Sequence, residues 1–421
     1  MHHIVVIVAA FGLHQSAPAQ LTSIPSPAGP DSQAFRLVAD GDDSALLIWH
    51  EKAAEQPELA EGEWVPPTWD LNVSRFVDGA WSSPVTIDSR DDYFVNWADT
   101  PCVARAPSGE LLITWLQKSG PGTYTYDIHA ATSHDEGATW NHLGVIHDDG
   151  VKSEHGFVSM TADDDALRLI WLDGRNMTAG EGGHANHGSG GSMTARTALY
   201  RDGAFIDSKQ LDDRTCECCA TDLAITPSGP VVIYRDRSHN ETRDIAVVRS
   251  DGDGWSRPTT IWPDNWIIPA CPVNGPAIDA SDQLVAVAWF TAGKGAFAVN
   301  TIFSHDAGRT FGRPVTVEAR SEQFHPVGRI DLVVDDESAL VSYLRDDLTS
   351  GGAQVVLRRV DQNSGLSDAQ VIASLPRGRA TGFPKLIHIG DQLMVAWTTI
   401  DADGTTQIKT TTVAPPPQTK K

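Results

Sequence analysis

Thiol and imidazole side chains, which bind soft metal ions, occur along more than half of this chain. Thiolates and imidazoles are ligands for Zn²⁺ and for softer ions such as Cu(I). Because the cysteines number five, disulfide pairing alone would leave at least one thiol over. If the fold brings these groups together, they predict a zinc or copper site. The candidate ligands are Cys102, His155, Cys216, Cys218, Cys219, Cys271 and His325.

An internal repeat determines where these side chains fall. Short apolar runs that end in an aromatic residue recur at intervals of 54 to 66 residues, at Trp49, Trp115, Trp171, Tyr234, Trp289, Tyr343 and Trp397. Each unit has four short strands joined by Gly- and Asp-rich turns, which is the pattern of a β-propeller blade. We therefore expect an all-β propeller of seven four-stranded blades, with six as the alternative. The units begin near residues 33, 98, 155, 217, 270, 324 and 381.

The two ends of the chain have their own signals. An apolar run over residues 4–13, followed by Ala17-Pro18-Ala19, predicts an export signal over residues 1–19. A single propeller domain then covers residues 20–413, and the tail at residues 414–421 is expected to be disordered. Because the last unit has only three strands, the segment Leu21 to Pro27 is expected to supply its outer strand and close the ring.

Charge and hydropathy exclude several classes of partner. With 32 basic and 55 acidic residues, the net charge is −23. Nucleic acids and anionic membrane surfaces attract basic patches, so neither is expected as the main partner. No segment approaches the roughly 20 apolar residues that a membrane-spanning helix needs. We expect a soluble monomer in the periplasm or outside the cell.

The repeat predicts that the candidate metal ligands meet at one end of the propeller channel. Cys102, Cys218 with Cys219, and Cys271 open the inner strands of units two, four and five, and Cys216 lies just before. His155 and His325 take the equivalent position in units three and six. Three alternatives to a metal site stay open: two disulfides with a spare thiol, isolated buried cysteines, and a nucleophilic thiol beside one of the histidines.

A second set of candidates consists of arginines and carboxylates at the ends of the second strands. Guanidinium groups among carboxylates suit an anionic or sugar-like ligand. Alternatively, the same residues could pair across neighbouring blades and only close the ring. The Gly-rich segment Thr178 to Met193, which includes His184 and His187, is either a lid over this face or an insertion. The candidate catalytic residues are Arg36, Asp173, Arg175, Asp236, Arg237, Arg329 and Arg345.

Two stretches, Ser133 to Trp140 and Ser304 to Phe311, both match the pattern S-x-D-x-G-x-T-[WF]. This pattern resembles the Asp box, or BNR repeat, of the sialidase superfamily, and Phe35-Arg36 followed by ALLIWHEK resembles a sialidase first blade. The resemblance covers nearly the whole chain after the export signal. The S-x-D-x-G-x-T-[WF] motif falls between the third and fourth strands of a blade, on the face opposite the usual active site, so we interpret the motif as structural.

The resemblance implies an active site of three arginines, a tyrosine nucleophile paired with a glutamate, and an aspartate acid/base. Arg36, Arg237 and either Arg329 or Arg345 are the candidates for the arginines. Arg36 is followed by Leu-Val where the family usually has Ile-Pro, and no motif in this chain places the other three residues.

Three functions follow as hypotheses. The first is an exported, sialidase-like propeller that binds or hydrolyses a carbohydrate or another anionic small molecule, as an exo-glycosidase of sialidase type if it is an enzyme. Asp173 or Asp236 would then be the general acid. The second is a periplasmic protein that binds zinc or copper through the Cys/His set. The third is a non-catalytic interaction scaffold.

Overall fold

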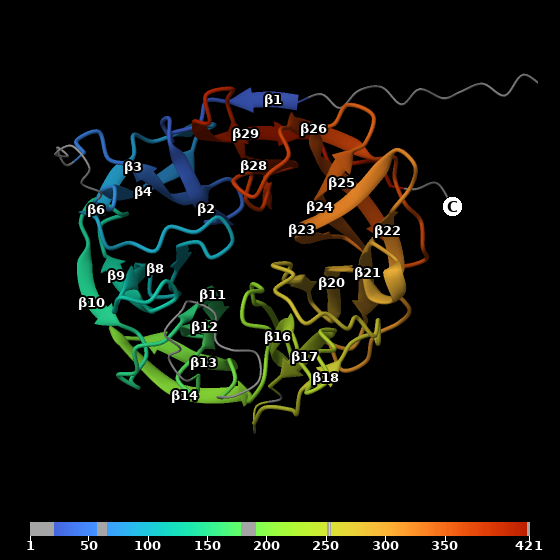
Figure 1. The fold of residues 1–421 in the computed structure, drawn as a ribbon, viewed down its shortest axis with the longest axis horizontal. Helices are drawn as coiled ribbons and strands as arrows, with labels where there is room; N and C mark the ends of the chain where they lie inside the picture. Colours follow the sequence, from blue (N-terminus) through green and yellow to red (C-terminus); the bar gives the residue numbers. More distant parts are fainter. Residues whose placement is uncertain (1–20, 57–64, 178–190, 251, 253, 419–421) are drawn as a thin grey trace, which may run out of the picture.

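A closed ring of seven β-sheets surrounds a central channel (Figure 1). The computed structural model describes residues 21–56, 65–177, 191–250, 252 and 254–418. The expected export signal and the loop histidines His184 and His187 lie outside these residues. The prediction of an all-β, seven-bladed propeller is confirmed. No helix in the described part of the chain has the length and apolar character needed to cross a membrane.

The first three blades follow one another along the chain. Blade 1 has its outer strand in two pieces and contains β2 (Ser32–Ala39), β3 (Ala45–Lys52), β4 (Trp69–Val77), β5 (Ala80–Trp81) and β6 (Val85–Arg90). Blade 2 contains β7 (Cys102–Arg105), β8 (Leu111–Lys118), β9 (Tyr126–Ser133) and β10 (Asn141–Val145). Blade 3 contains β11 (His155–Asp163), β12 (Ala166–Asp173), β13 (Thr194–Arg201) and β14 (Ala204–Asp212).

The next three blades repeat this order. Blade 4 contains β15 (Asp222–Thr226), β16 (Gly229–Arg235), β17 (Ile245–Arg249) and β18 (Thr259–Thr260). Blade 5 contains β19 (Ala277–Ser281), β20 (Leu284–Thr291), β21 (Ala298–Ser304) and β22 (Val315–Ala319), with one 3₁₀ turn at Gly293–Gly295. Blade 6 contains β23 (Phe324–Asp335), β24 (Ser338–Asp347), β25 (Ala353–Asp361) and β26 (Gln370–Leu375).

Blade 7 is completed by the beginning of the chain. Its strands β27 (Lys385–Ile389), β28 (Gln392–Ile400) and β29 (Thr406–Val413) are joined by β1 (Leu21–Ile24) as the outer strand. The pairing runs antiparallel from Leu21 opposite Val413 to Ile24 opposite Thr410, and Figure 1 shows β1 beside β29. The outer strand expected from the segment Leu21 to Pro27 is therefore present.

The aromatic residues that mark the repeat anchor each blade between its neighbours. Six of the seven are buried, and Trp397 is half-buried. The polar tips of the six buried residues are hydrogen-bonded, as buried tryptophan and tyrosine tips usually are. For example, Trp171 Nε1 donates to Asp173 at 2.9 Å, and the Tyr234 hydroxyl donates to Asp212 at 2.6 Å. The second strands are buried on both faces, which explains their nearly continuous apolar runs.

Aspartates on the channel side connect four of the blades to the blade that follows. In each case one carboxylate accepts the backbone N–H of a residue 55 to 58 positions later, which is one repeat further along the chain. The pairs are Asp99 with Phe157 (2.7 Å), Asp222 with Ile278 (3.0 Å), Asp279 with Val334 (2.7 Å) and Asp331 with Leu386 (2.8 Å). These bonds fix how neighbouring inner strands are placed along the channel axis, and so they position the residues at the channel mouth.

The two S-x-D-x-G-x-T turns form the same hydrogen bonds in blades 2 and 5. In the β21–β22 turn, Ser304 Oγ accepts the N–H of Gly308 at 2.9 Å, and Asp306 Oδ1 accepts the N–H of Thr310 at 2.8 Å. The β9–β10 turn repeats both bonds at 2.8 Å each. Gly308 has a φ of 76°, a conformation that favours glycine. The motif therefore stabilises a turn, as expected.

Replacing Ser304 with alanine is expected to lower the free energy of unfolding by about 1–2 kcal/mol. The change leaves the buried N–H of Gly308 without its acceptor, and an unsatisfied buried donor has a cost of this size. Urea denaturation of Ser304→Ala measures it, and Ser133→Ala should cost the same amount. A neutral effect at both positions, with exposed Ser108→Ala as the reference, would contradict this role for the motif.

The first residues of the Pro-rich end of the chain contact blade 6. The carbonyl of Pro416 accepts a hydrogen bond from Arg359 Nε at 2.7 Å, and Pro416 is buried. Arg359 is itself held by Ser338 and Asp335. The first residues of the tail are thus attached to blade 6, because a buried guanidinium there needs an acceptor.

Candidate functional site

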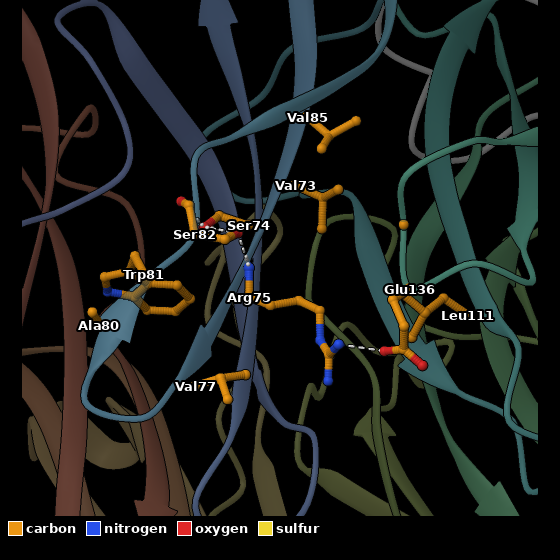
Figure 2. A pocket seen from close by; sticks show the side chains of 11 residues that line it. Val73, Ser74, Arg75, Val77, Ala80, Trp81, Ser82, Val85, Leu111 and Glu136 are labelled. Carbon is orange, nitrogen blue, oxygen red and sulfur yellow. Dashed lines mark hydrogen bonds and ion pairs between the residues drawn. The ribbon is translucent and has the colours of Figure 1, made fainter.

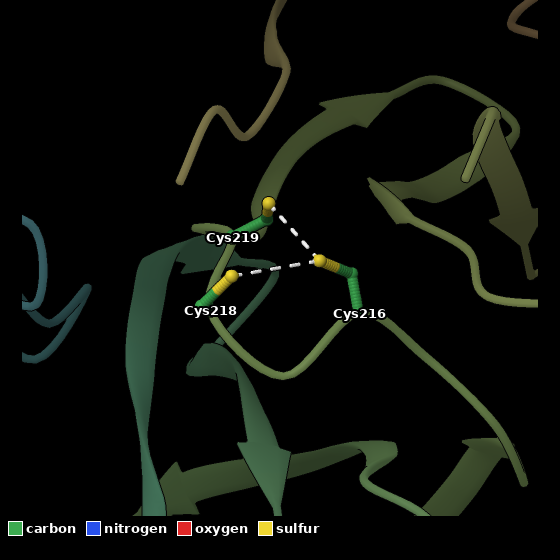
Figure 3. A group of neighbouring side chains, drawn as sticks. All are labelled: Cys216, Cys218 and Cys219. Atoms are coloured by element: carbon green, nitrogen blue, oxygen red, sulfur yellow. Dashed lines mark hydrogen bonds between the residues drawn. The ribbon is translucent and has the colours of Figure 1, made fainter. Parts of the chain in front are cut away.

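Three cysteine sulfurs meet in the loop before β15. Cys216 Sγ lies 3.8 Å from Cys218 Sγ and 3.2 Å from Cys219 Sγ (Figure 3). The Cys271 thiol, from the loop before β19, hydrogen-bonds to the Cys218 thiol. All five cysteines of the chain are free thiols in the structure. Four of them therefore form one group, which we call the thiol cluster: Cys216, Cys218, Cys219 and Cys271.

Close contact between two loops assembles the thiol cluster. A Cβ on Gly275 would lie 2.2 Å from the carbonyl oxygen of Ala220, so only glycine allows the loop before β19 to approach so closely. The backbone N–H of Asn274 also donates to Cys219 Sγ at 3.4 Å. We expected Cys218, Cys219 and Cys271 to open inner strands, but β15 begins at Asp222 and β19 at Ala277. The cysteines stand in the preceding loops because these segments pack against each other.

Buried charges surround Cys216. Arg243 is fully buried, and its Nη1 lies 3.1 Å from Cys216 Sγ and 3.0 Å from Glu217 Oε2. Burial raises the pKa of the Cys216 thiol, but hydrogen bonds from Cys218 and Cys219, together with the charge of Arg243, outweigh it and hold the pKa well below its usual range. The hydrogen bond from Cys218 likewise lowers the pKa of Cys271. The same hydrogen bonds raise the pKa of Cys218, and burial raises that of Cys219, so the thiolate, which is the form that binds metals, is favoured at Cys216 and Cys271.

The remaining predicted metal ligands do not join the thiol cluster. Cys102 opens β7 and is buried among apolar residues of blades 2 and 3. His325 lies in β23 against the ring of Phe297, with 4.7 Å between the ring centroids. His155 opens β11 and belongs to a separate group with His147. The expected single cluster is thus divided, because the inner strands start at different points around a wide channel.

The group around His155 contains residues that the sequence did not single out. The His147 and His155 rings are stacked, with centroids 3.9 Å apart. Carboxylates surround the pair: Asp127 from β9, Asp149 from the loop after β10, and Asp173 from the end of β12. Both imidazoles are buried, and burial next to His155 lowers the pKa of His147 to about 4.

The predicted arginines all have partners within the protein. Arg237 pairs with Glu217 and Glu241 beside the thiol cluster. Arg345 pairs with Glu318 at 3.0 Å, and Arg329 donates to Thr381 and to the carbonyls of Gly378 and Gly382. Arg36 donates to the carbonyl of Val158 at 3.1 Å and lines a narrow cavity in the channel, together with Lys385, Asp222 and Asp331.

Asp173, Arg175 and Asp236 likewise have structural partners. Arg175 holds Asp173 with two hydrogen bonds of 2.7 and 2.9 Å and reaches Asp149 at 3.0 Å. Burial raises the pKa of Asp236 to about 6, and the nearby charge of Asp212 adds to the effect. Of the arginine–carboxylate pairs, Arg345 with Glu318 and Arg175 with Asp149 join neighbouring blades, whereas the pairs of Arg237 lie within blade 4.

A buried tyrosine between two carboxyl groups lies on the same face as the thiol cluster. The Tyr126 hydroxyl lies 3.0 Å from Glu154 Oε1 and 3.4 Å from Asp99 Oδ2. Burial raises the pKa of Glu154 to about 8 and that of Asp99 to about 7. Both carboxyl groups can therefore hold a proton near neutral pH, which general acid catalysis requires. No motif in the sequence marked these residues.

Replacing Asp99 with asparagine is expected to raise stability at pH 8 by roughly 2–4 kcal/mol and to change it little at pH 4. The folded pKa of about 7 lies above the unfolded value of about 3.9. The folded protein therefore binds more protons between these values and loses stability as the pH rises. Asparagine does not ionise and can still accept the N–H of Phe157. Urea denaturation at both pH values measures the effect, and an equal change at each would contradict it.

A groove elsewhere in the ring lies between blades 1 and 2. It is lined by Val73, Trp81 and Leu111 among others, and Figure 2 shows Arg75 pointing toward Glu136 within it. Arg75 pairs with Glu136 and with Asp40, and Arg105 pairs with the same two carboxylates. These ion pairs fasten blade 1 to the β9–β10 turn, so the groove is a seam between blades.

The fold and site define a seven-bladed β-propeller with a thiol cluster and a histidine–carboxylate group at its channel face. No family model matches the sequence, and a search of curated proteins finds no significant match. Among solved structures, a Dyadobacter fermentans protein of unknown function has a TM-score of 0.51 and 13% identity, over 95% of this chain and 99% of that one. This likeness supports the fold.

Two further solved structures resemble the chain more weakly. A Penicillium chrysogenum α-L-arabinanase has a TM-score of 0.46 and 14% identity, over 94% of this chain and 98% of that one. A Trypanosoma rangeli sialidase has a TM-score of 0.45 and 11% identity, over 79% of this chain and 56% of that one. These scores are too low to support an inference about function.

Proposed function

We propose that this protein is an exported metal-binding propeller that holds one Cu(I) or Zn²⁺ ion in the thiol cluster. The observation behind the proposal is the approach of four thiols from two separate loops. Soft thiolate ligands favour Cu(I) and Zn²⁺ over harder cations. The export signal predicted over residues 1–19 suits a protein that takes up its ion outside the cytoplasm.

The sulfur positions agree with a coordinated ion. A Zn–S bond of about 2.3 Å in a tetrahedral site separates two sulfurs by about 3.8 Å. The Cys216–Cys218 distance is 3.8 Å, and the Cys216–Cys219 distance of 3.2 Å needs to open by only about half an ångström. Arg243 offsets part of the negative charge that several thiolates bring to one buried place.

Metal titration of reduced protein tests the proposal. Protein prepared without oxygen should bind one equivalent of Cu(I) against a competing chelator, and Co²⁺ should give the strong charge-transfer absorption of sulfur ligands. The double variant Cys216→Ser/Cys218→Ser should lose this binding by more than about 100-fold, because it removes two ligands. Cys102→Ala is the matched control and should bind like the wild type.

Oxidised thiols are the outcome that would overturn the proposal. If protein isolated without added metal holds little metal and mass spectrometry shows its cysteines paired in disulfides, the cluster is a structural crosslink. Equal Cu(I) binding by the double variant and the wild type would also overturn it.

A second candidate function is recognition or hydrolysis of an acidic carbohydrate at the same face. Tyr126 with Glu154 supports it, because the sialidase resemblance implies a tyrosine nucleophile paired with a glutamate. Asp99 would be the acid/base, and Arg36 in the channel would contact the carboxylate of the substrate. This assignment replaces Asp173 and Asp236 as the acid, since Asp173 is held by Arg175 and Trp171.

Turnover of sialosides and other acidic glycans tests the second candidate. Tyr126→Phe should abolish turnover, while Tyr200→Phe, in the outer part of blade 3, should retain it. No turnover and no glycan binding by the wild type would remove this function. If metal binding fails as well, an interaction scaffold is the remaining hypothesis.

A further inference from the structure

We propose that Asp127, His147 and His155 form a second metal site, which binds a divalent first-row cation through two imidazoles and one carboxylate. The three ligand atoms are Asp127 Oδ1, His147 Nε2 and His155 Nδ1. Asp127 Oδ1 lies 3.7 Å from His147 Nε2 and 3.6 Å from His155 Nδ1, and all three atoms lie within 4.8 Å of one another. The site lies between blades 2 and 3 and uses no cysteine.

These spacings match a coordination sphere. Zn–N and Zn–O bonds of about 2.0–2.2 Å in a tetrahedral site separate neighbouring ligand atoms by about 3.3–3.6 Å. The two measured distances are at or slightly above the upper end of this range. An ion placed among the three atoms therefore needs a small inward movement of the ligand atoms. At least one of the two stacked imidazole rings must also turn, so that its nitrogen lone pair faces the ion.

The same three atoms lack any other partner. Asp127 Oδ1, His147 Nε2 and His155 Nδ1 are all buried without a hydrogen bond. The His147 side chain is 2% exposed and the His155 side chain is fully buried. Leaving buried polar atoms unsatisfied costs free energy, so the fold retains three such atoms side by side at a considerable cost. A bound cation would satisfy all of them at once.

A neighbouring carboxylate orients the imidazoles from the other side. Asp149 Oδ2 lies 3.1 Å from His155 Nε2, where it hydrogen-bonds, and 3.4 Å from His147 Nδ1. Histidines that bind metals typically donate their second ring N–H to such a carboxylate. Arg175 in turn holds Asp149 at 3.0 Å. The arrangement thus fixes which nitrogen of His155 remains available as a ligand.

A competing trio in the same group does not fit a cation as well. Asp149, His155 and Asp173 also lie close together. However, the carboxylates of Asp149 and Asp173 are already paired with Arg175, and Asp173 also accepts a hydrogen bond from Trp171 Nε1 at 2.9 Å. We therefore assign the ion to the Asp127 side.

The ligand types indicate the class of ion. Imidazole and carboxylate favour Zn²⁺, Fe²⁺, Co²⁺ or Mn²⁺ over the soft Cu(I) proposed for the thiol cluster. Three protein ligands leave at least one coordination position open.

Co²⁺ titration of a protein without the thiol cluster tests the second site independently of the first. The variant Cys216→Ser/Cys218→Ser/Cys219→Ser/Cys271→Ser should still bind one Co²⁺, with weak visible absorption bands and no sulfur charge-transfer band. Adding His147→Gln or Asp127→Asn should weaken this binding by more than about 100-fold. Asp149→Asn should weaken it by about 10–100-fold, as loss of an orienting partner does.

Two matched controls accompany these variants. His134→Gln changes an exposed histidine in the β9–β10 turn, and Asp148→Asn changes the exposed carboxylate beside Asp149. Both should leave Co²⁺ affinity unchanged. Equal binding by the His147→Gln variant and its parent would overturn the proposal.

If the variants do not fold, the proposal can be tested on the wild-type protein. Its crystals are soaked in Co²⁺, and the cobalt is located by anomalous diffraction. An anomalous difference peak should appear about 2 Å from Asp127 Oδ1, His147 Nε2 and His155 Nδ1. If cobalt appears only at the thiol cluster or nowhere, this group is a hydrogen-bonding network without a metal.

Discussion

Replacing Arg243 with methionine is expected to lower the free energy of unfolding by roughly 3–5 kcal/mol and to weaken metal binding by the thiol cluster. Arg243 is fully buried and donates to Cys216 Sγ, to Glu217 and, at 3.0 Å, to Glu241. Arg237 still pairs with both glutamates, but the Cys216 sulfur loses its cationic partner, and removing one partner of a buried charge pair has a cost of this size. Methionine fills a similar volume, so the effect is mainly electrostatic.

The same change should raise the pKa of Cys216. Hydrogen bonds from Cys218 and Cys219 remain, but the charge that favours the thiolate is lost. Protons then compete better with the metal, and the apparent affinity at neutral pH should fall by about 10–100-fold. The alkylation rate of Cys216, measured against pH, reports the fraction of its thiolate form. Competitive titration with a chelator reports the metal affinity of the thiol cluster.

Arg359→Met is the matched control for Arg243→Met. Arg359 is also buried and pairs with Asp335, Ser338 and Pro416 in blade 6. Its loss should destabilise the fold without changing metal affinity. If both variants lose the same affinity, the effect of Arg243 is a general loss of stability and not a property of the cluster.

The architecture could be predicted from the sequence because each blade repeats the same physical requirements. A second strand buried on both faces needs an apolar run, and its aromatic end needs a polar partner, as with Trp171 and Asp173. These signals recur about once per blade and are visible without any alignment. The split outer strand of blade 1 was not predicted, because β5 and β6 are short and none of their residues is fully buried.

The site could be predicted only in part, because its assembly depends on loops. Cysteines are rare, so their positions in the repeat are informative. Four of the five thiols do come together in the structure. Cys102 does not, because its strand places it among apolar side chains of blades 2 and 3. Arg243 and His147 come from outside the inner strands, at positions where the repeat predicts nothing. Their roles appear only in three dimensions, where Arg243 contacts the loop before β15 in its own blade and His147 contacts β11 of the next blade.

Removal of β1 is expected to destabilise the closed ring by roughly 2–5 kcal/mol and to promote association. The strand contributes main-chain pairing over Leu21–Ile24, and each hydrogen bond lost costs about 0.5–1.5 kcal/mol. Thr411 Oγ1 also donates to the carbonyl of Thr22 at 2.8 Å, and Thr410 Oγ1 to that of Ile24 at 3.0 Å. Without β1, the unpaired edge of β29 is open to other chains.

A pair of truncated proteins isolates this effect. One begins at Leu21 and the other at Pro25, so they differ only by the four residues of β1. Thermal unfolding should show a lower midpoint for the shorter protein, and light scattering should show larger particles at the same concentration. Other contacts still hold blade 7 to blade 1, such as the N–H of Ile408 donating to Ser32 Oγ at 3.0 Å. If both proteins have the same midpoint, these inner contacts alone close the ring and β1 is dispensable.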